Sequence, residues 1–181
     1  TAKAKPQEPV VVETPSSIST TKLPEQGTLT ILIDPDGKVY LDMAGQHTRK
    51  ALIEDMNSRF TMGLSEEEKM RFSIAGAFGV PRKQLKPWLA LATTERNKLE
   101  VPGVPTDSTN NELAPWIHHA RLAQFQMKQE GVVSDEYVIV VKAYPAIQTV
   151  INTLVDVNVN KFNLITSQET DPSKTEVELE K

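Results

Sequence analysis

The chain has 181 residues, of which 39% are hydrophobic, and a formal net charge of -4 at pH 7. This length suits one compact domain with flexible segments, and the dispersed Lys and Arg residues exclude the basic stripe that nucleic acid requires. The absence of cysteine excludes disulfides and thiolate metal sites, and no apolar run approaches the ~20 residues of a membrane-spanning helix.

Residues 1–27 are predicted to form a flexible tether. They contain four prolines and a Ser/Thr cluster but no aromatic residue, so they cannot bury enough surface to fold alone. Within this tether, Val10 to Val12 form a β-branched run that Pro15 ends. We expect this run to add as a strand to an open sheet edge of its own domain or of a twin subunit.

Residues 28–42 are predicted to form a β-hairpin. Apolar and polar residues alternate on both sides of a turn at Asp34–Gly37. Asp34 and Asp36 before a glycine also resemble the start of a calcium loop. A turn is favoured because a proline interrupts this loop and no bidentate Glu follows it.

The middle of the chain is predicted to be helical. One helix covers about 47–60, and a second begins at a capping box formed by Ser65 and Glu68 and reaches Phe78. A third helix follows at 84–93.

A long surface loop then covers about 95–109, where Pro, Gly and Ser are frequent. It is followed by a helix that begins near 109–111 and extends to about Gly131, with Glu112 as its reciprocal cap.

The sequence contains no recognisable arrangement of catalytic or metal-binding residues. His118 and His119 are adjacent, so on a helix they diverge by about 100 degrees and cannot face one metal from the same side. No nucleophile elbow, phosphate loop or zinc motif occurs. We therefore expect no enzyme activity, no metal and no cofactor.

The C-terminal part predicts a strand, a helix and a second strand. Residues 137–143 are largely apolar, 144–157 carry an apolar stripe at helical spacing, and Lys161–Thr166 alternate again. Two strands joined by one helix lie in the same sheet, with a right-handed crossover if they are parallel. The charged residues at 169–181 predict a disordered tail.

These elements predict an α+β fold. We expect a four-stranded sheet in a domain spanning 28–168, with the C-terminal β-α-β unit and an inserted helical region at about 61–130 packed on it.

Three segments carry a resemblance to a known family. The tether contributes Val10, Val12, Pro15 and Ser17, and the hairpin contributes Asp36, Gly37 and Tyr40. The C-terminal unit contributes the longest set, namely Lys142, Ala143, Tyr144, Val150, Leu154, Val159, Lys161, Phe162, Leu164, Ile165 and Thr166. In this order they resemble the periplasmic part of the ExbD/TolR family, the small subunits of proton-driven motors in Gram-negative envelopes.

The resemblance implies a periplasmic domain of a single-pass inner-membrane protein that forms a homodimer. It implies an ExbB-like channel subunit as partner, contacted through a transmembrane helix outside this sequence, and a TonB-like protein whose outer-membrane transport is energised. The residues expected to bind partners are Val10, Val12, Pro15, Lys142, Tyr144, Leu154, Phe162 and Leu164.

Two alternatives stay open. A TolR-like subunit would bind peptidoglycan and maintain the outer membrane, although the tether pattern favours ExbD. An enzyme within residues 54–127 is disfavoured because no acid, base or nucleophile there has a partner at useful spacing. This region is longer than a minimal family domain, and the acidic residue often found after Ala143 is missing.

Overall fold

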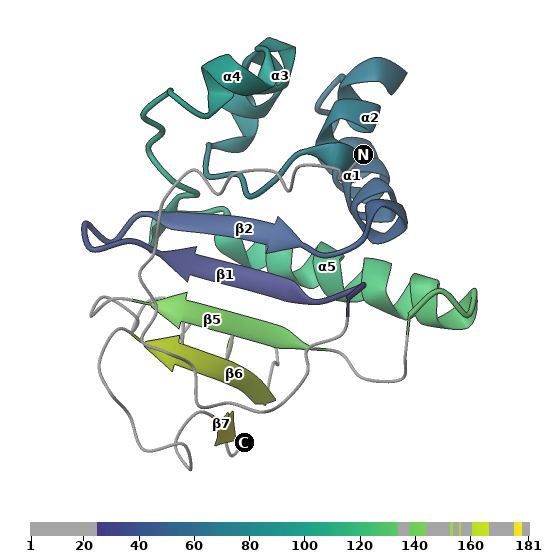
Figure 1. Ribbon diagram of the computed structural model, residues 1–181, viewed down its shortest axis with the longest axis vertical. Coiled ribbons are helices and arrows are strands. Elements are labelled where there is room, and N and C mark those ends of the chain that lie inside the picture. Colours follow the sequence, from purple (N-terminus) through teal and green to yellow (C-terminus); the bar gives the residue numbers. More distant parts are fainter. Residues whose placement is uncertain are drawn as a thin grey trace, which may run out of the picture.

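The protein has a mixed α+β fold, seen in a computed structural model that describes residues 25–133, 138–143 and 161–166, with Thr153, Asp156 and Glu176–Glu178. Side chains are described for 25–133, 138–142 and the two single residues. Helices lie behind the sheet and beyond one of its edges (Figure 1). Among these residues, no helix is long and apolar enough to cross a membrane.

The main sheet has five strands in the order β2-β1-β5-β6-β7. Its strands are β1 (Leu29–Ile33), β2 (Val39–Met43), β5 (Ile139–Ala143), β6 (Lys161–Thr166) and β7 (Glu176–Glu178). The central pairs β1–β5 and β5–β6 are parallel, whereas the outer pairs β1–β2 and β6–β7 are antiparallel. A parallel pair needs a crossover connection, and only the outer strands can be joined by short turns.

The α+β class is confirmed, but the predicted four-stranded sheet is wrong. The four expected strands are present, and β7 adds a fifth from the range 169–181, which we predicted to be a disordered tail. The three residues of β7 pair with the first three residues of β6, so this short strand depends on β6 for its hydrogen bonds. A separate two-stranded sheet, β3 (Thr106–Asp107) and β4 (Asn110–Asn111), lies within and just beyond the predicted loop.

The β1–β2 turn forms as the sequence predicts. The Asp34 carboxylate oxygen Oδ1 accepts hydrogen bonds from the backbone N–H groups of Asp36 at 3.0 Å and Lys38 at 2.8 Å. Gly37 has a φ of 81°, a conformation that glycine adopts without steric cost. The carboxylate is therefore used to hold the turn, in agreement with the turn interpretation.

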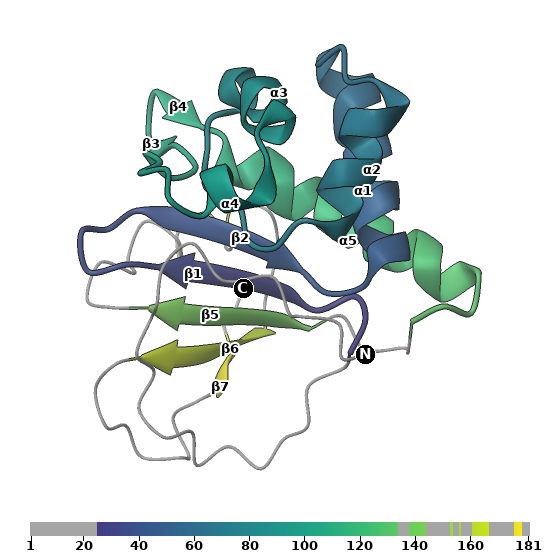
Figure 2. The ribbon, with the colours of Figure 1, turned by 45° about the horizontal axis from the view of Figure 1, so that its top comes forward.

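Five helices are described, namely α1 (Gln46–Phe60), α2 (Glu66–Ile74), α3 (Arg82–Ala90), α4 (Thr93–Arg96) and α5 (Leu113–Gln129). Helix α5 covers one face of the sheet, and α1 to α4 gather beyond β2 (Figures 1 and 2). The Ser65–Glu68 capping box is confirmed at the start of α2.

An aromatic cluster joins α5 to the helical region. The Trp116 ring lies with its centroid 6.0 Å from that of Phe72 and 4.8 Å from that of Phe78. All three side chains are almost completely buried. Each large aromatic ring buries enough apolar area to dominate its surroundings energetically, so this cluster fixes α2 and the following segment over α5.

Helix α2 is shorter than predicted. It ends at Ile74 because Ala75 is extended, with φ -68° and ψ 156°. Phe78 then pairs with Leu41 of β2 through two backbone hydrogen bonds of 2.8 and 2.9 Å. Met70 and Ile74 of α2 are 47% and 58% exposed.

Glu112 has a different role from the one predicted. It precedes α5, but its carboxylate accepts a 2.7 Å hydrogen bond from the backbone N–H of Arg82 at the start of α3. The cap of α5 comes from Asn111, whose Oδ1 accepts from the Ala114 N–H at 3.2 Å. Glu112 thus connects two helices that are distant in sequence.

Most of the helix predicted at 144–157 lies outside the described residues, but Thr153 and Asp156 are helical. Thr153 is buried, and its hydroxyl accepts a 3.1 Å hydrogen bond from the Asn111 side-chain amide. Asp156 is exposed, in agreement with its predicted place off the apolar stripe.

Arg49 of α1 is the most extensively bonded buried side chain between the sheet and the helical region. It is 3% exposed, and its guanidinium donates to the Asp42 carboxylate at 3.0 Å. It also donates to backbone carbonyl oxygens of Met43, Phe72 and Gly76 at 2.9 to 3.3 Å. Burial lowers the pKa of Arg49 to about 10, against the opposing effect of the Asp42 charge, so the side chain stays charged at neutral pH.

We expect Arg49→Met to lower the free energy of unfolding by about 3 to 5 kcal/mol, because it leaves one carboxylate and three carbonyls without their donor. Arg59→Met, on the exposed side of the same helix, should change it by no more than about 0.5 kcal/mol. Urea titrations measure both values, and equal losses would show that Arg49 does not hold these elements together.

The Tyr40 side chain of β2 is buried and closely packed. A Cβ atom at Gly79 would lie 2.4 Å from the Tyr40 ring, so glycine is needed there for close packing. The ring is buried, and the hydroxyl is hydrogen-bonded to Asp34. Burial, followed by the Asp34 charge, raises the pKa of Tyr40 to about 12.

This pKa predicts a specific loss of stability in alkali. Between pH 10 and 12 an unfolded chain releases the Tyr40 proton while the folded protein keeps it, so the free energy of unfolding falls as pH rises. Tyr40→Phe should lose less stability than the parent across this window. Denaturant titrations from pH 9 to 11.5 measure the two slopes, and parallel slopes would contradict the assignment.

Candidate partner-binding surfaces

The β2 edge of the sheet is closed by the protein's own chain. Besides the Phe78–Leu41 pair, the Val104 N–H donates to the Val39 carbonyl at 2.8 Å. The Met43 carbonyl accepts from Arg49. With these backbone groups already bonded, β2 does not offer the unpaired row that an added strand needs.

The opposite edge is only partly covered. Residues 161–163 of β6 pair with β7, whereas 164–166 pair with β5 on one side and with no other described strand. An edge with free N–H and C=O groups is a template for an incoming extended segment. We call residues 164–166 together with β7 the open edge.

Five of the eight predicted site residues are not described. Val10, Val12 and Pro15 lie outside the described residues, as do Tyr144 and Leu154.

Three of the predicted residues lie in β5 and β6. Lys142 pairs with Ile165 in one cross-strand row, and Leu164 pairs with Val141 in the next. Adjacent rows belong to opposite faces of a sheet, so Lys142 lies on a different face from Leu164 and Phe162.

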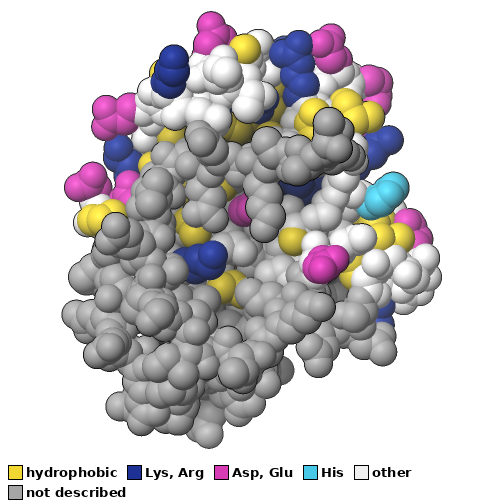
Figure 3. All heavy atoms as spheres, in the orientation of Figure 1, with side chains coloured by type: hydrophobic (Ala, Val, Ile, Leu, Met, Phe, Trp, Pro, Cys, Tyr) yellow, Lys and Arg dark blue, Asp and Glu magenta, His cyan; other side chains and the backbone are white. Residues whose placement is uncertain are grey.

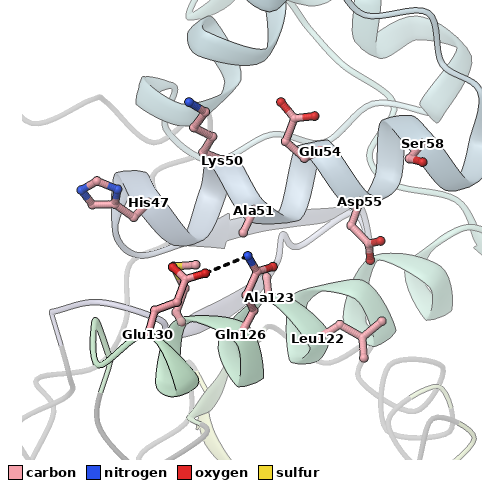
Figure 4. Close-up of a pocket in the computed structure, with 11 residues that line it drawn as sticks. His47, Lys50, Ala51, Glu54, Asp55, Ser58, Leu122, Ala123, Gln126 and Glu130 are labelled. Atoms are coloured by element: carbon pink, nitrogen blue, oxygen red, sulfur yellow. Dashed lines mark hydrogen bonds between the residues drawn. The ribbon is translucent and has the colours of Figure 1, made fainter.

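A groove lies between α1 and α5, with a volume of about 650 Å³. We call it the α1–α5 groove; the side chains in Figure 4 come from both helices and line its two walls. Its apolar part is formed by Ala51, Leu122, Ala123 and Met127. Leu122 is 45% exposed, so this part of the groove is open to a ligand.

The polar part of this groove is mainly acidic. It contains three carboxylates, those of Glu54, Asp55 and Glu130, against a single lysine, Lys50. Glu54 is paired with Lys69 of α2 at 2.8 Å, and Asp55 contacts the Nδ1 atom of His119. Glu130 accepts a 3.0 Å hydrogen bond from Gln126.

The sequence did not predict this groove. Leu122 falls outside the apolar stripe expected for its helix. This isolated leucine was the only indication of the groove in the sequence. Which helix lies beside α5 is decided by contacts over about 64 residues of sequence, such as the Asp55–His119 pair.

The two adjacent histidines diverge as predicted. The His118 and His119 rings are nearly perpendicular, at 86°, and only His119 is buried. In the described part of the chain, no three His, Cys, Asp or Glu side chains are grouped so that they could hold a metal ion.

The outer surface of the helical region carries charges of both signs. In Figure 3, Lys and Arg side chains alternate with Asp and Glu there, with small hydrophobic areas between them. Exposed hydrophobic residues include Met70 and Ile74 of α2 and Phe125 of α5. Neither positive nor negative charge dominates this face.

Comparison of the chain with family models, with curated proteins and with solved structures gives no match.

Proposed function

We propose that this chain is the periplasmic domain of an ExbD-like subunit, which binds a TonB-like protein in a proton-driven inner-membrane motor. The observation that carries the proposal is the asymmetry of the sheet within the described residues: β2 is bonded to residues 78 and 104, whereas no described strand pairs beyond β7 or beside residues 164–166 on their outer side. A sheet with one open edge suits binding of an extended partner segment through backbone hydrogen bonds. The domain acts by binding, not by catalysis.

The short open edge suits reversible binding. Each backbone hydrogen bond contributes about 0.5 to 1.5 kcal/mol net, so a segment that pairs with three residues is held weakly. A motor subunit must take and release its partner in every cycle, and a weak contact allows this. A homodimer carries two such edges close together, which raises their local concentration for the partner.

The proposal also draws on the resemblance to ExbD in the tether, the hairpin and the C-terminal unit. On this basis the ExbB-like channel subunit is contacted through a transmembrane helix outside the sequence, and the domain forms a homodimer in the periplasm. We further propose that residues 144–157 form the crossover helix of a β-α-β unit. The parallel β5–β6 pairing and the helical Thr153 and Asp156 support this.

Photo-crosslinking in cells tests the proposed partner. A photoreactive phenylalanine analogue is placed at positions 164, 165 and 166 in turn, in the full-length protein. We expect a cross-link to the TonB-like protein from at least one of these positions. Leu99, which is 48% exposed in the helical region, is the matched control and should give none.

Cross-links to the TonB-like protein from Leu99 alone would overturn the open edge as the binding site. Retention of the protein on purified cell-wall sacculi, without any cross-link to a TonB-like protein, would support the TolR-like alternative instead.

A further inference from the structure

We propose that the α1–α5 groove is the docking site of the chain's own tether, with Val10–Val12 lying across its apolar part. This is a contact within one chain, distinct from partner binding at the open edge. Four observations carry it: the place where the tether joins the domain, its length, its apolar run and the state of the sheet edges.

The tether joins the domain beside the groove. The Gly27 N–H donates to the Ala44 carbonyl at 2.7 Å, just before α1, and the Gly27 carbonyl accepts from the side-chain amide of Gln124 in α5. His47 and Glu130 line this same end of the groove, shown together in Figure 4. The chain that precedes Glu25 therefore starts at the mouth of the groove.

The tether is long enough to lie in it. The α1 wall extends from His47 to Ser58, about 16 Å at a rise of ~1.5 Å per residue. Residues 13–24 separate the valine run from Glu25 and span up to about 40 Å when extended. Such a short connection gives an effective concentration of about millimolar, so a weak contact is populated.

The chemistry of the two surfaces is complementary. Val10–Val12 is the densest apolar run in the tether, and Leu122 is the half-exposed residue of the apolar part of the groove. Glu8 and Glu13 flank this run, and Glu54 and Asp55 of the groove already contact Lys69 and His119, so the match between the two surfaces is apolar and not one of charge. Pro9 and Pro15 flank the run and favour an extended chain, which lowers the entropy cost of docking.

One sheet edge is closed to the tether, and the other is the edge proposed for the partner. The β2 edge is bonded to residues 78 and 104, and β7 already covers half of β6. We therefore place the tether in the groove in preference to the strand addition expected from sequence.

Because the chain has no cysteine, Thr14→Cys gives a single site for a nitroxide label next to the intact valine run. NMR spectra of the full chain are recorded with the label oxidised and reduced. We expect loss of signal intensity at Ala51, Leu122 and Met127, with the Leu99 signal unaffected. This pattern reports proximity of the tether to the groove.

Two charge-introducing variants of α5 test the specificity. Leu122→Glu should restore the lost intensities, whereas Phe125→Glu, an equally exposed change outside the groove lining, should leave them reduced. Circular dichroism confirms that both variants fold. Intensity losses at 161–166 in place of the groove, no losses at all, or equal effects of the two variants would overturn the proposal.

Discussion

The buried charge of Arg49 determines how the helical region meets the sheet. Its guanidinium bonds to Asp42 and Met43 of β2 and to the carbonyls of Phe72 and Gly76. A buried cation without these partners would be strongly destabilising, so the Arg49 bonds favour this arrangement of α1, α2 and β2. Its bonds to residues 72 and 76 hold the chain around the end of α2, and Phe78 follows against Leu41. The segment that satisfies the buried Arg49 guanidinium is therefore the same segment that closes the β2 edge.

This closure makes the two edges of the sheet unequal. With β2 covered, residues 164–166 and β7 are the part of this sheet's edge that no other described strand pairs. The helical region that bonds to β2 removes one of the two sheet edges at which an extended segment could pair. The same region supplies α1 and α5, whose groove lies where the tether leaves the domain. We propose that partner binding and tether docking use separate surfaces of the domain.

Local chemistry made much of the fold predictable from sequence. The Asp34 turn and the Ser65–Glu68 capping box depend on residues within four positions of each other. The longer helices and strands follow from the period of apolar residues. The errors arose where distant contacts occur: Arg49 bonds to the carbonyls of Phe72 and Gly76 around the end of α2, and Glu112 accepts from the Arg82 N–H 30 residues away. β7 has no apolar pattern and forms only against β6, and the groove requires α1 beside α5.

Hydrogen exchange of the full-length protein tests the central claim, that partners bind at the open edge and not at β2. The backbone amides of 161–166 and of Val39–Met43 are followed with and without the periplasmic domain of the TonB-like protein. The account predicts slower exchange in 161–166 on binding and unchanged exchange in β2. Slower exchange confined to β2, or to the helices beyond it, would contradict the account.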